Sequence, residues 1–402
     1  VLDDDDTVAY RAVMGRWLID LALLLDWGGG HRNSVHHHPC WNNEEFQVLT
    51  GLGYCAEPYE GKEKEEEQLR RLRSPEYLRQ RLRQRRVELS QITLSPDLPL
   101  VRNLNLLAAL LGLSEAELAV LCFAVFVRGN HTFQRAIAQQ SQSTSTPFLH
   151  KLLARLTGLS QDDFRAALSP TSTLMTTGLV SINARSVDLE DKLDVRPDLA
   201  NILFVPHADA VTLMARFLKR SPRHTLTLAH FPHLARDAEA AVGLLRAVLD
   251  NKSAGANLLL YGPPGVGKTE YAAALAEAVG ADLYEVDYAD DDGDPIRGER
   301  RLHAFNLCQR LLARRDNALL LFDEVEDVFE RNPFKRLFGG SEDSATAGKA
   351  WINRTLENNP VPALWLTNDA GSIDPAYRRR FDYAIRFSTP PQSVRIEIAR
   401  HH

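Results

Sequence analysis

The period of apolar and polar positions changes about halfway along the chain. Leucines recur at near-helical spacing over residues 69–82 among alternating charges, which predicts a solvated amphipathic helix. Further helices are expected between Leu98 and Ile137. One of them, Glu115–Val127, begins with Ser114 and Glu117 in the spacing of a capping box. The first half of the chain therefore predicts mostly helices.

From Thr225 onward, short apolar runs alternate with helical segments. Strands are predicted at 257–261, 282–287, 318–322, 363–366 and 383–387. The segments between them predict helices at 268–279, 299–315 and 346–356. This alternation is typical of βαβ units, so we expect an α/β fold with a parallel sheet covered by helices on both faces.

These patterns divide the chain into three predicted domains. Residues 1–145 form a mostly helical domain, residues 146–222 a small helical unit with short strands, and residues 223–402 the α/β domain. A chain of 402 residues is too long for a single compact core. Because it begins at Val1 and stops at His402 within an expected helix, we expect a fragment or an incompletely ordered chain.

Composition narrows the classes of function. A net charge of −6 argues against a chain-wide nucleic-acid surface. The 4 cysteines lie far apart, which favours a reducing cytoplasm. No apolar run has the roughly 18 residues that cross a bilayer, so we expect no membrane contact. The segment His36–Cys40 carries metal-capable side chains, but consecutive histidines seldom close a tetrahedral site, and a solvated loop is the preferred interpretation.

A glycine-rich loop lies between the first strand of the α/β domain and an alanine-rich helix. It matches the pattern G-x-x-x-x-G-K-[ST], with the residues Gly262, Pro263, Pro264, Gly265, Val266, Gly267, Lys268 and Thr269. Glycines let the backbone N–H groups point at phosphate oxygens, at the positive end of a helix dipole. We expect Lys268 to reach the β- and γ-phosphates and the Thr269 hydroxyl to bind Mg²⁺.

Two carboxylates follow the apolar strand 318–322. A buried parallel strand delivers the residues after its carboxyl end to the edge of the sheet that also carries the phosphate loop. We expect Asp323 to hold Mg²⁺ directly or through water. If water attacks the γ-phosphate of a bound nucleotide, Glu324 would orient and deprotonate that water. Glu326 is interpreted as a helix-start charge.

Together these motifs resemble the AAA+ ATPases, in particular their AAA branch, over residues 225–400. The resemblance implies that Asn368, after the strand 363–366, helps to position the water. It also implies arginine fingers that contact the nucleotide of a neighbouring subunit, with Arg380 the first candidate and Arg379 the second. A basic loop paired with Asp374 and Asp382 is the alternative for these arginines. Phe231 and His233 are candidates for base contacts.

The resemblance implies an ATPase that uses ATP and Mg²⁺, assembles into a ring or helical homo-oligomer such as a hexamer, and remodels a macromolecular partner, expected to be an unknown protein. Residues 146–222 resemble the winged-helix unit that precedes the motor in some bacterial AAA+ proteins, so a DNA-acting protein is one alternative. A non-hydrolysing nucleotide-dependent scaffold is the other. The acidic segment Tyr288–Arg297 lacks the aromatic–apolar–glycine triplet of peptide-threading relatives. From the resemblance we expect the helical lid of such proteins to be absent or truncated here, with Arg395 at its expected start.

Overall fold

A computed structural model describes residues 4–25, 43–52, 75–139, 144–196, 198–222, 225–286, 298–329 and 351–392. Contacts divide the chain into two compact units, residues 1–208 and 209–402. The histidine loop His36–Cys40, the acidic segment Tyr288–Arg297 and the expected lid start at Arg395 lie outside the described residues. Among the described residues, no helix combines the length and apolar character needed to cross a bilayer.

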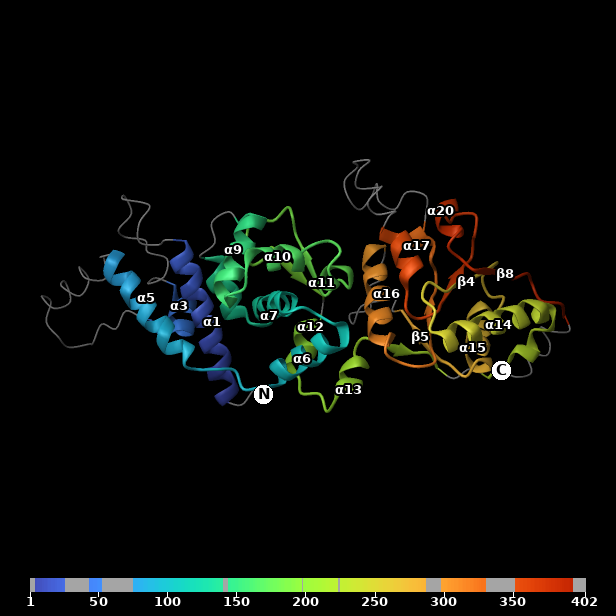
Figure 1. Cartoon of the computed structure of the whole chain (residues 1–402), viewed down its shortest axis with the longest axis horizontal. Coiled ribbons are helices and arrows are strands. Elements are labelled where there is room, and N and C mark those ends of the chain that lie inside the picture. Colours follow the sequence, from blue (N-terminus) through green and yellow to red (C-terminus); the bar gives the residue numbers. More distant parts are fainter. Residues whose placement is uncertain are drawn as a thin grey trace, which may run out of the picture. The chain divides into compact units, whose positions relative to one another are not determined.

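The first unit is mainly helical, as predicted (Figure 1). Its elements are α1 (Asp4–Leu24), α3 (Glu44–Thr50), α5 (Pro75–Ser90), α6 (Pro99–Leu111), α7 (Glu115–Gly129), α8 (His131–Ala138), α9 (Thr146–Thr157), α10 (Gln161–Ala167), α11 (Thr173–Thr176), β1 (Val180–Ile182), β2 (Leu193–Val195) and α12 (Leu199–Phe204). The capping box is confirmed, because Ser114 and Glu117 exchange both hydrogen bonds at the start of α7.

The core of this unit includes a cluster of aromatic rings. Trp17 of α1 packs against Phe123 and Phe126 of α7 and Phe133 of α8, with ring centroids between 5.4 and 6.1 Å apart. One turn along α1, the fully buried Asp20 carboxylate accepts a 2.6 Å hydrogen bond from Arg86 Nε of α5. Asp20 is also paired at 3.3 Å with Arg155 of α9. A buried carboxylate needs such partners, and this one ties three helices together.

Helices α9, α10 and α11 precede an antiparallel strand pair in which Val180 lies opposite Val195. Helix α9 also contacts α1 and α7, so these elements belong to the same compact unit as the preceding helices. The winged helix and the domain boundary at residue 145 stay predictions.

The second unit is built on a six-stranded sheet of order β3-β5-β6-β7-β4-β8. Its strands are β3 (Lys219–Arg220), β4 (Asn257–Tyr261), β5 (Asp282–Glu285), β6 (Ala318–Phe322), β7 (Ala363–Thr367) and β8 (Tyr383–Arg386). The five strands from β4 to β8 are parallel, which confirms the fold class. The short β3 pairs antiparallel with β5, so the sheet includes residues that precede the expected domain start at 223.

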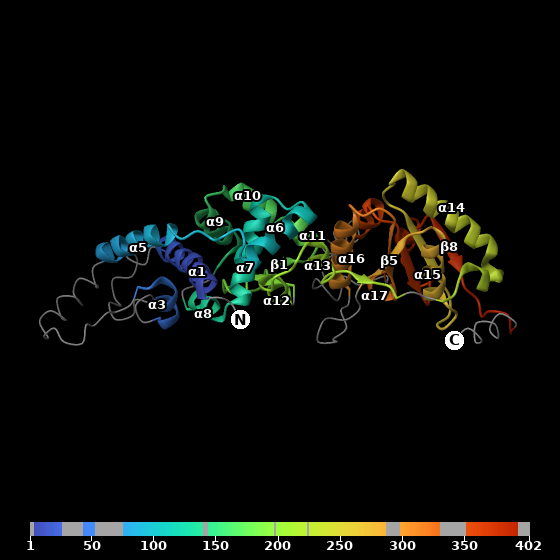
Figure 2. The ribbon, with the colours of Figure 1, turned by 90° about the horizontal axis from the view of Figure 1, so that it is seen from below.

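Helices cover both faces of this sheet (Figures 1 and 2). The helical elements are α13 (Ala210–Met214), η1 (Leu228–His230), η2 (Pro232–Leu234), α14 (Ala235–Asn251), α15 (Lys268–Ala278), α16 (Glu299–Leu312), α17 (Glu326–Phe329), residues 351–358 and α20 (Pro375–Arg378). In both views α14 and α15 lie on one side of the strands and α16 lies on the other.

The alternation of side chains along each strand explains the two layers. Leu258 and Leu260 of β4 share a buried cluster with Tyr271 of α15. On the opposite face, Trp365 of β7 packs against Phe305 of α16, with ring centroids 4.7 Å apart. Because both faces are buried, the central strands β4, β6 and β7 consist almost entirely of apolar residues. The sheet is therefore a rigid base for the loops at its carboxyl edge.

Candidate nucleotide site

The phosphate loop joins β4 to α15 at the carboxyl edge of the sheet. Gly262, Gly265 and Gly267 all have positive φ angles, at 149°, 74° and 87°. A Cβ atom on Gly262 would lie 2.2 Å from the carbonyl oxygen of Phe387, so only glycine fits there. Pro263 and Pro264 are exposed on the loop, whereas Val266 is buried in the core below it. The loop thus has three glycines in backbone conformations that residues with side chains rarely adopt.

Lys268, the first residue of α15, reaches back across this loop. Its ammonium group donates hydrogen bonds to the carbonyl oxygens of Gly262 at 2.7 Å and Pro263 at 2.9 Å. It donates a third bond, of 2.9 Å, to the Asn368 carboxamide oxygen. Burial lowers the pKa of the Lys268 ammonium, and the nearby carboxylates of Asp323 and Glu326 oppose that shift. Lys268 is therefore a desolvated cation held against the first residues of the phosphate loop.

The two predicted acids follow β6 directly. The Thr269 hydroxyl lies 3.5 Å from the Asp323 carboxylate. Burial raises the pKa of Asp323, although its carboxylate accepts a 2.7 Å hydrogen bond from the backbone N–H of Glu324. Glu324 itself is exposed. A hydroxyl and a desolvated carboxylate side by side form the kind of oxygen donor set that Mg²⁺ prefers.

Glu324 adopts the left-handed backbone region, with a φ of 50°. This conformation is unfavourable for a residue with a side chain, and it persists where the surroundings hold it. Here Arg301 of α16 donates to the carbonyl oxygens of Asp323 at 2.5 Å and Glu324 at 2.8 Å. Its guanidinium also lies 4.3 Å from the centre of the Phe322 ring. Arg301, which no sequence motif indicates, fixes the turn that presents Glu324.

Asn368 follows β7, the strand between the loop strand β4 and the acid strand β6. Its backbone N–H donates to the Glu326 carboxylate at 2.5 Å, and the Thr367 hydroxyl donates to the same oxygen at 2.8 Å. Glu326 does begin α17, as interpreted from the sequence, but it also anchors the turn that carries Asn368. The strand order explains how Asn368 comes to lie between Lys268 and the acids.

The donor set at this edge fits a nucleotide with its magnesium ion. Lys268 and the N–H groups at the start of α15 suit phosphate oxygens. Thr269 and Asp323 would hold the cation, which would neutralise phosphate charge. Glu324 and Asn368 are both exposed beside them. The structure thus brings together every predicted loop, metal and water-positioning residue.

The two candidate arginine fingers lie elsewhere. Arg380 precedes β8, which runs parallel to β4. Two residues after Arg380, the backbone N–H of Asp382 donates to the carbonyl oxygen of Asn257 at the start of β4. The phosphate loop begins at the other end of β4, about 13 Å away at the usual rise of a strand. Arg379 is exposed and Arg380 is paired with Glu357 at 2.6 Å. Both arginines are therefore remote from this chain's own loop.

The candidates for base contacts lie behind the loop. Phe231 is fully buried and packs edge-on against Tyr271, with ring centroids 5.2 Å apart. It fills the space beside Gly267, where an added Cβ would lie 3.3 Å from its ring. The nitrogens of His233 are buried and make no hydrogen bond among the described residues, and burial lowers the pKa of its imidazole. Phe231 is thus a core residue in this structure, and a base contact by His233 stays a prediction.

Comparison with known proteins agrees with this geometry. The family described as "ATPase family associated with various cellular activities (AAA)" matches residues 258–389. A putative 26S proteasome regulatory subunit homolog of Methanocaldococcus jannaschii is 28% identical over 145 residues, 35% of this chain and 38% of the relative. An ATPase family AAA domain-containing protein 3A homolog of Drosophila melanogaster is 32% identical over 151 residues, 37% of this chain and 24% of the relative. The chain spans well under half the length of these curated relatives.

Solved structures of AAA proteins are also similar. The AAA domain of FIGL-1 in complex with ADP is 18% identical, covering 45% of this chain and 62% of that one, with a TM-score of 0.34. PCH-2 of C. elegans is 20% identical, covering 44% of this chain and 49% of that one, with a TM-score of 0.29.

The parallel sheet, the glycine loop and the acids beside it define a P-loop nucleotide-binding domain. Residues 258–389 are, more particularly, an AAA ATPase domain.

Proposed function

We propose that this chain binds ATP with Mg²⁺ at the phosphate loop and hydrolyses it to ADP and phosphate. The observation that carries the proposal is the 3.5 Å approach of the Thr269 hydroxyl to the Asp323 carboxylate, beside the ammonium of Lys268. Glu324 would accept the proton of the attacking water, and Asn368 would orient that water. A magnesium ion would supply the charge neutralisation that phosphoryl transfer needs.

Turnover is proposed to require an assembly of several copies. Arg380 lies at the amino end of β8, whereas the phosphate loop lies at the carboxyl end of the parallel strand β4. Arg380 would therefore act on the nucleotide of an adjacent copy, in a ring or helical homo-oligomer. Arg379, which is exposed next to it, is the second candidate for this role.

The test compares the wild-type chain with Glu324→Gln. We expect the wild type to release phosphate from Mg–ATP, and Glu324→Gln to bind ATP with unchanged affinity while turnover falls at least about 100-fold. Phosphate release by Glu324→Gln at the wild-type rate would refute the assignment of the base. Arg380→Ala should bind ATP normally and hydrolyse it poorly even at high protein concentration.

We further propose that hydrolysis serves to remodel a protein partner through the first unit, residues 1–208. The proposal follows from the AAA domain together with a separate helical unit that has its own core. Glu324→Gln saturated with ATP should retain this partner in a pull-down, and Lys268→Ala should not. Salt-dependent binding of duplex DNA by the full chain, in place of a protein partner, would favour the DNA-acting alternative.

A further inference from the structure

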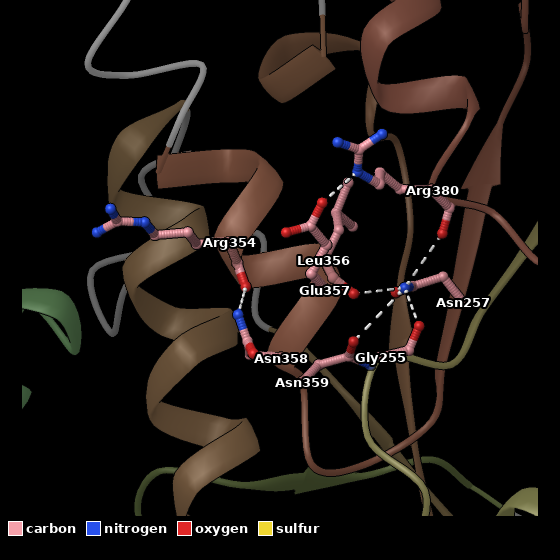
Figure 3. A network of polar contacts seen from close by, with 8 residues as sticks. All are labelled: Gly255, Asn257, Arg354, Leu356, Glu357, Asn358, Asn359 and Arg380. Atoms are coloured by element: carbon pink, nitrogen blue, oxygen red, sulfur yellow. Dashed lines mark hydrogen bonds and ion pairs between the residues drawn. The ribbon is translucent and has the colours of Figure 1, made fainter.

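The side chain of Arg380 is held by a second residue of its own chain. Its Nε atom donates a 2.6 Å hydrogen bond to the carboxylate of Glu357, near the end of the helix formed by residues 351–358. The two side chains are 34% and 47% exposed, so the pair lies at the surface. In Figure 3 the terminal amino groups of Arg380 point away from Glu357. The pair thus uses the Nε atom of the guanidinium and leaves the terminal amino groups turned away from Glu357.

The backbones that carry this pair are fixed to the base of β4 (Figure 3). The carboxamide nitrogen of Asn257 donates to the carbonyl oxygen of Leu356 at 2.7 Å and to that of Arg380 at 3.4 Å. Its carboxamide oxygen accepts a 2.9 Å bond from Trp365 Nε1, which fixes the orientation of the amide. One buried asparagine therefore sets the spacing between the segment before Glu357 and the turn at Arg380.

A glycine contributes to the same arrangement. Gly255 has a φ of 83°, and a Cβ atom there would lie 2.6 Å from the carbonyl oxygen of Glu357. Its backbone N–H donates to the carbonyl oxygen of Asn359 at 2.9 Å. The end of the helix thus packs closely against the loop before β4. Gly255 and Asn257 together fix the position of the Glu357 backbone.

We infer that Glu357 is a positioning residue, which holds the guanidinium of Arg380 ready for the triphosphate bound to a second copy of this chain. The inference rests on the proposed action of Arg380 across subunits. A guanidinium offers five N–H donors in a fixed plane, so a carboxylate on Nε and phosphate oxygens on the terminal nitrogens can be bound together. Holding a long arginine side chain in one rotamer in advance removes part of the entropy cost of that contact.

The test is a double-substitution cycle in the full chain, with Mg–ATP turnover measured for Glu357→Ala, Arg380→Ala and the doubly substituted protein. An exposed ion pair is worth little, so we expect Glu357→Ala to lower kcat about three- to tenfold with KM for ATP unchanged. The doubly substituted protein should have the turnover of Arg380→Ala alone, because Glu357 acts only through Arg380. Glu357→Gln, whose amide oxygen still accepts from Nε, should recover part of the loss.

Arg354→Ala is the matched control, since Arg354 is exposed on the same helix and its side chain points away from Arg380 in Figure 3. It should keep wild-type kcat. The inference would be overturned if the losses of kcat in Glu357→Ala and Arg380→Ala multiplied in the doubly substituted protein. A wild-type or higher kcat for Glu357→Ala would also overturn it. Wild-type turnover by Arg380→Ala would instead refute the proposed action across subunits.

Discussion

The ammonium of Lys268 and the carboxamide of Asn368 are joined by a 2.9 Å hydrogen bond, although the two residues are 100 positions apart in the chain. This bond links the phosphate loop after β4 to the turn after β7. Because β7 lies between β4 and β6, the same turn also borders the two acids. We therefore expect the asparagine to contact both the phosphate side and the acid side of a bound nucleotide.

We expect Asn368→Ala and Lys268→Ala to affect different steps. Asn368→Ala should lower kcat about 10- to 100-fold and change the Kd for ATP by less than about threefold, because its expected role is in the attack by water. Lys268→Ala removes charged hydrogen bonds to phosphate and should weaken ATP binding about 10- to 150-fold. Calorimetric titration and phosphate release separate the two effects. An equal loss of affinity in both variants would contradict the assigned roles.

Glu326 anchors Asn368, so its removal should reproduce part of the Asn368 effect. In Glu326→Ala the Asn368 N–H and the Thr367 hydroxyl lose their shared acceptor. We expect kcat to fall about 10-fold while ATP affinity is retained. Glu326→Gln keeps an acceptor oxygen and should lose less. If Glu326→Ala turned over at the wild-type rate, Glu326 would be only the first residue of α17.

Arg301 holds the left-handed turn at Glu324. Arg301→Met leaves two carbonyl oxygens without these donors and should destabilise the protein by about 2–4 kcal/mol. Because Glu324 would then relax, turnover should fall more than ATP binding. Urea unfolding and kinetics at a temperature where the variant is folded measure the two effects. Arg301→Lys keeps the charge but lacks the pair of N–H groups that reaches both carbonyl oxygens, so it should recover only part of the lost stability and turnover. Full recovery would show that the positive charge alone is sufficient.

We expect His303 of α16 to make the stability of the second unit depend on pH. Its ring packs against Trp351 with centroids 5.4 Å apart, and burial lowers its pKa from the ordinary 6.5 to about 4. The unfolded chain therefore binds a proton between about pH 6.5 and pH 4 that the folded chain does not. Stability should fall across that window as the pH is lowered, by on the order of 1–3 kcal/mol. Thermal unfolding of His303→Asn should show a smaller fall between pH 7 and pH 4.5; an identical fall would exclude His303 as the cause.

Much of the second unit is predictable from sequence, because its determinants are local. The run Leu319–Phe322 is apolar throughout, so it predicts a strand buried on both faces, and the two acids come directly after it. The glycine loop is likewise a contiguous pattern. The observed β4 and β6 have the predicted bounds, and the other parallel strands differ from theirs by at most two residues.

The contacts that complete the site are not local. Arg301 reaches Glu324 across 23 positions, and Glu326 reaches Asn368 across 42. Such pairs depend on the order and register of strands, which apolar patterning alone does not determine. The two-residue strand β3 also depends on a contact between residues far apart in the chain. Lys219 and Arg220 have no strand pattern of their own, and they form a strand by pairing with β5.

Every role proposed for this site requires the phosphate loop and Asp323 to bind one magnesium–nucleotide complex. The most direct measurement is the affinity for ATP with and without Mg²⁺, in the wild type and in Asp323→Asn. We predict that Mg²⁺ tightens ATP binding at least about tenfold in the wild type, and that Asp323→Asn loses most of this tightening while it still binds metal-free ATP. If Mg²⁺ tightened ATP binding in Asp323→Asn as much as in the wild type, Asp323 would not be a ligand of the magnesium ion.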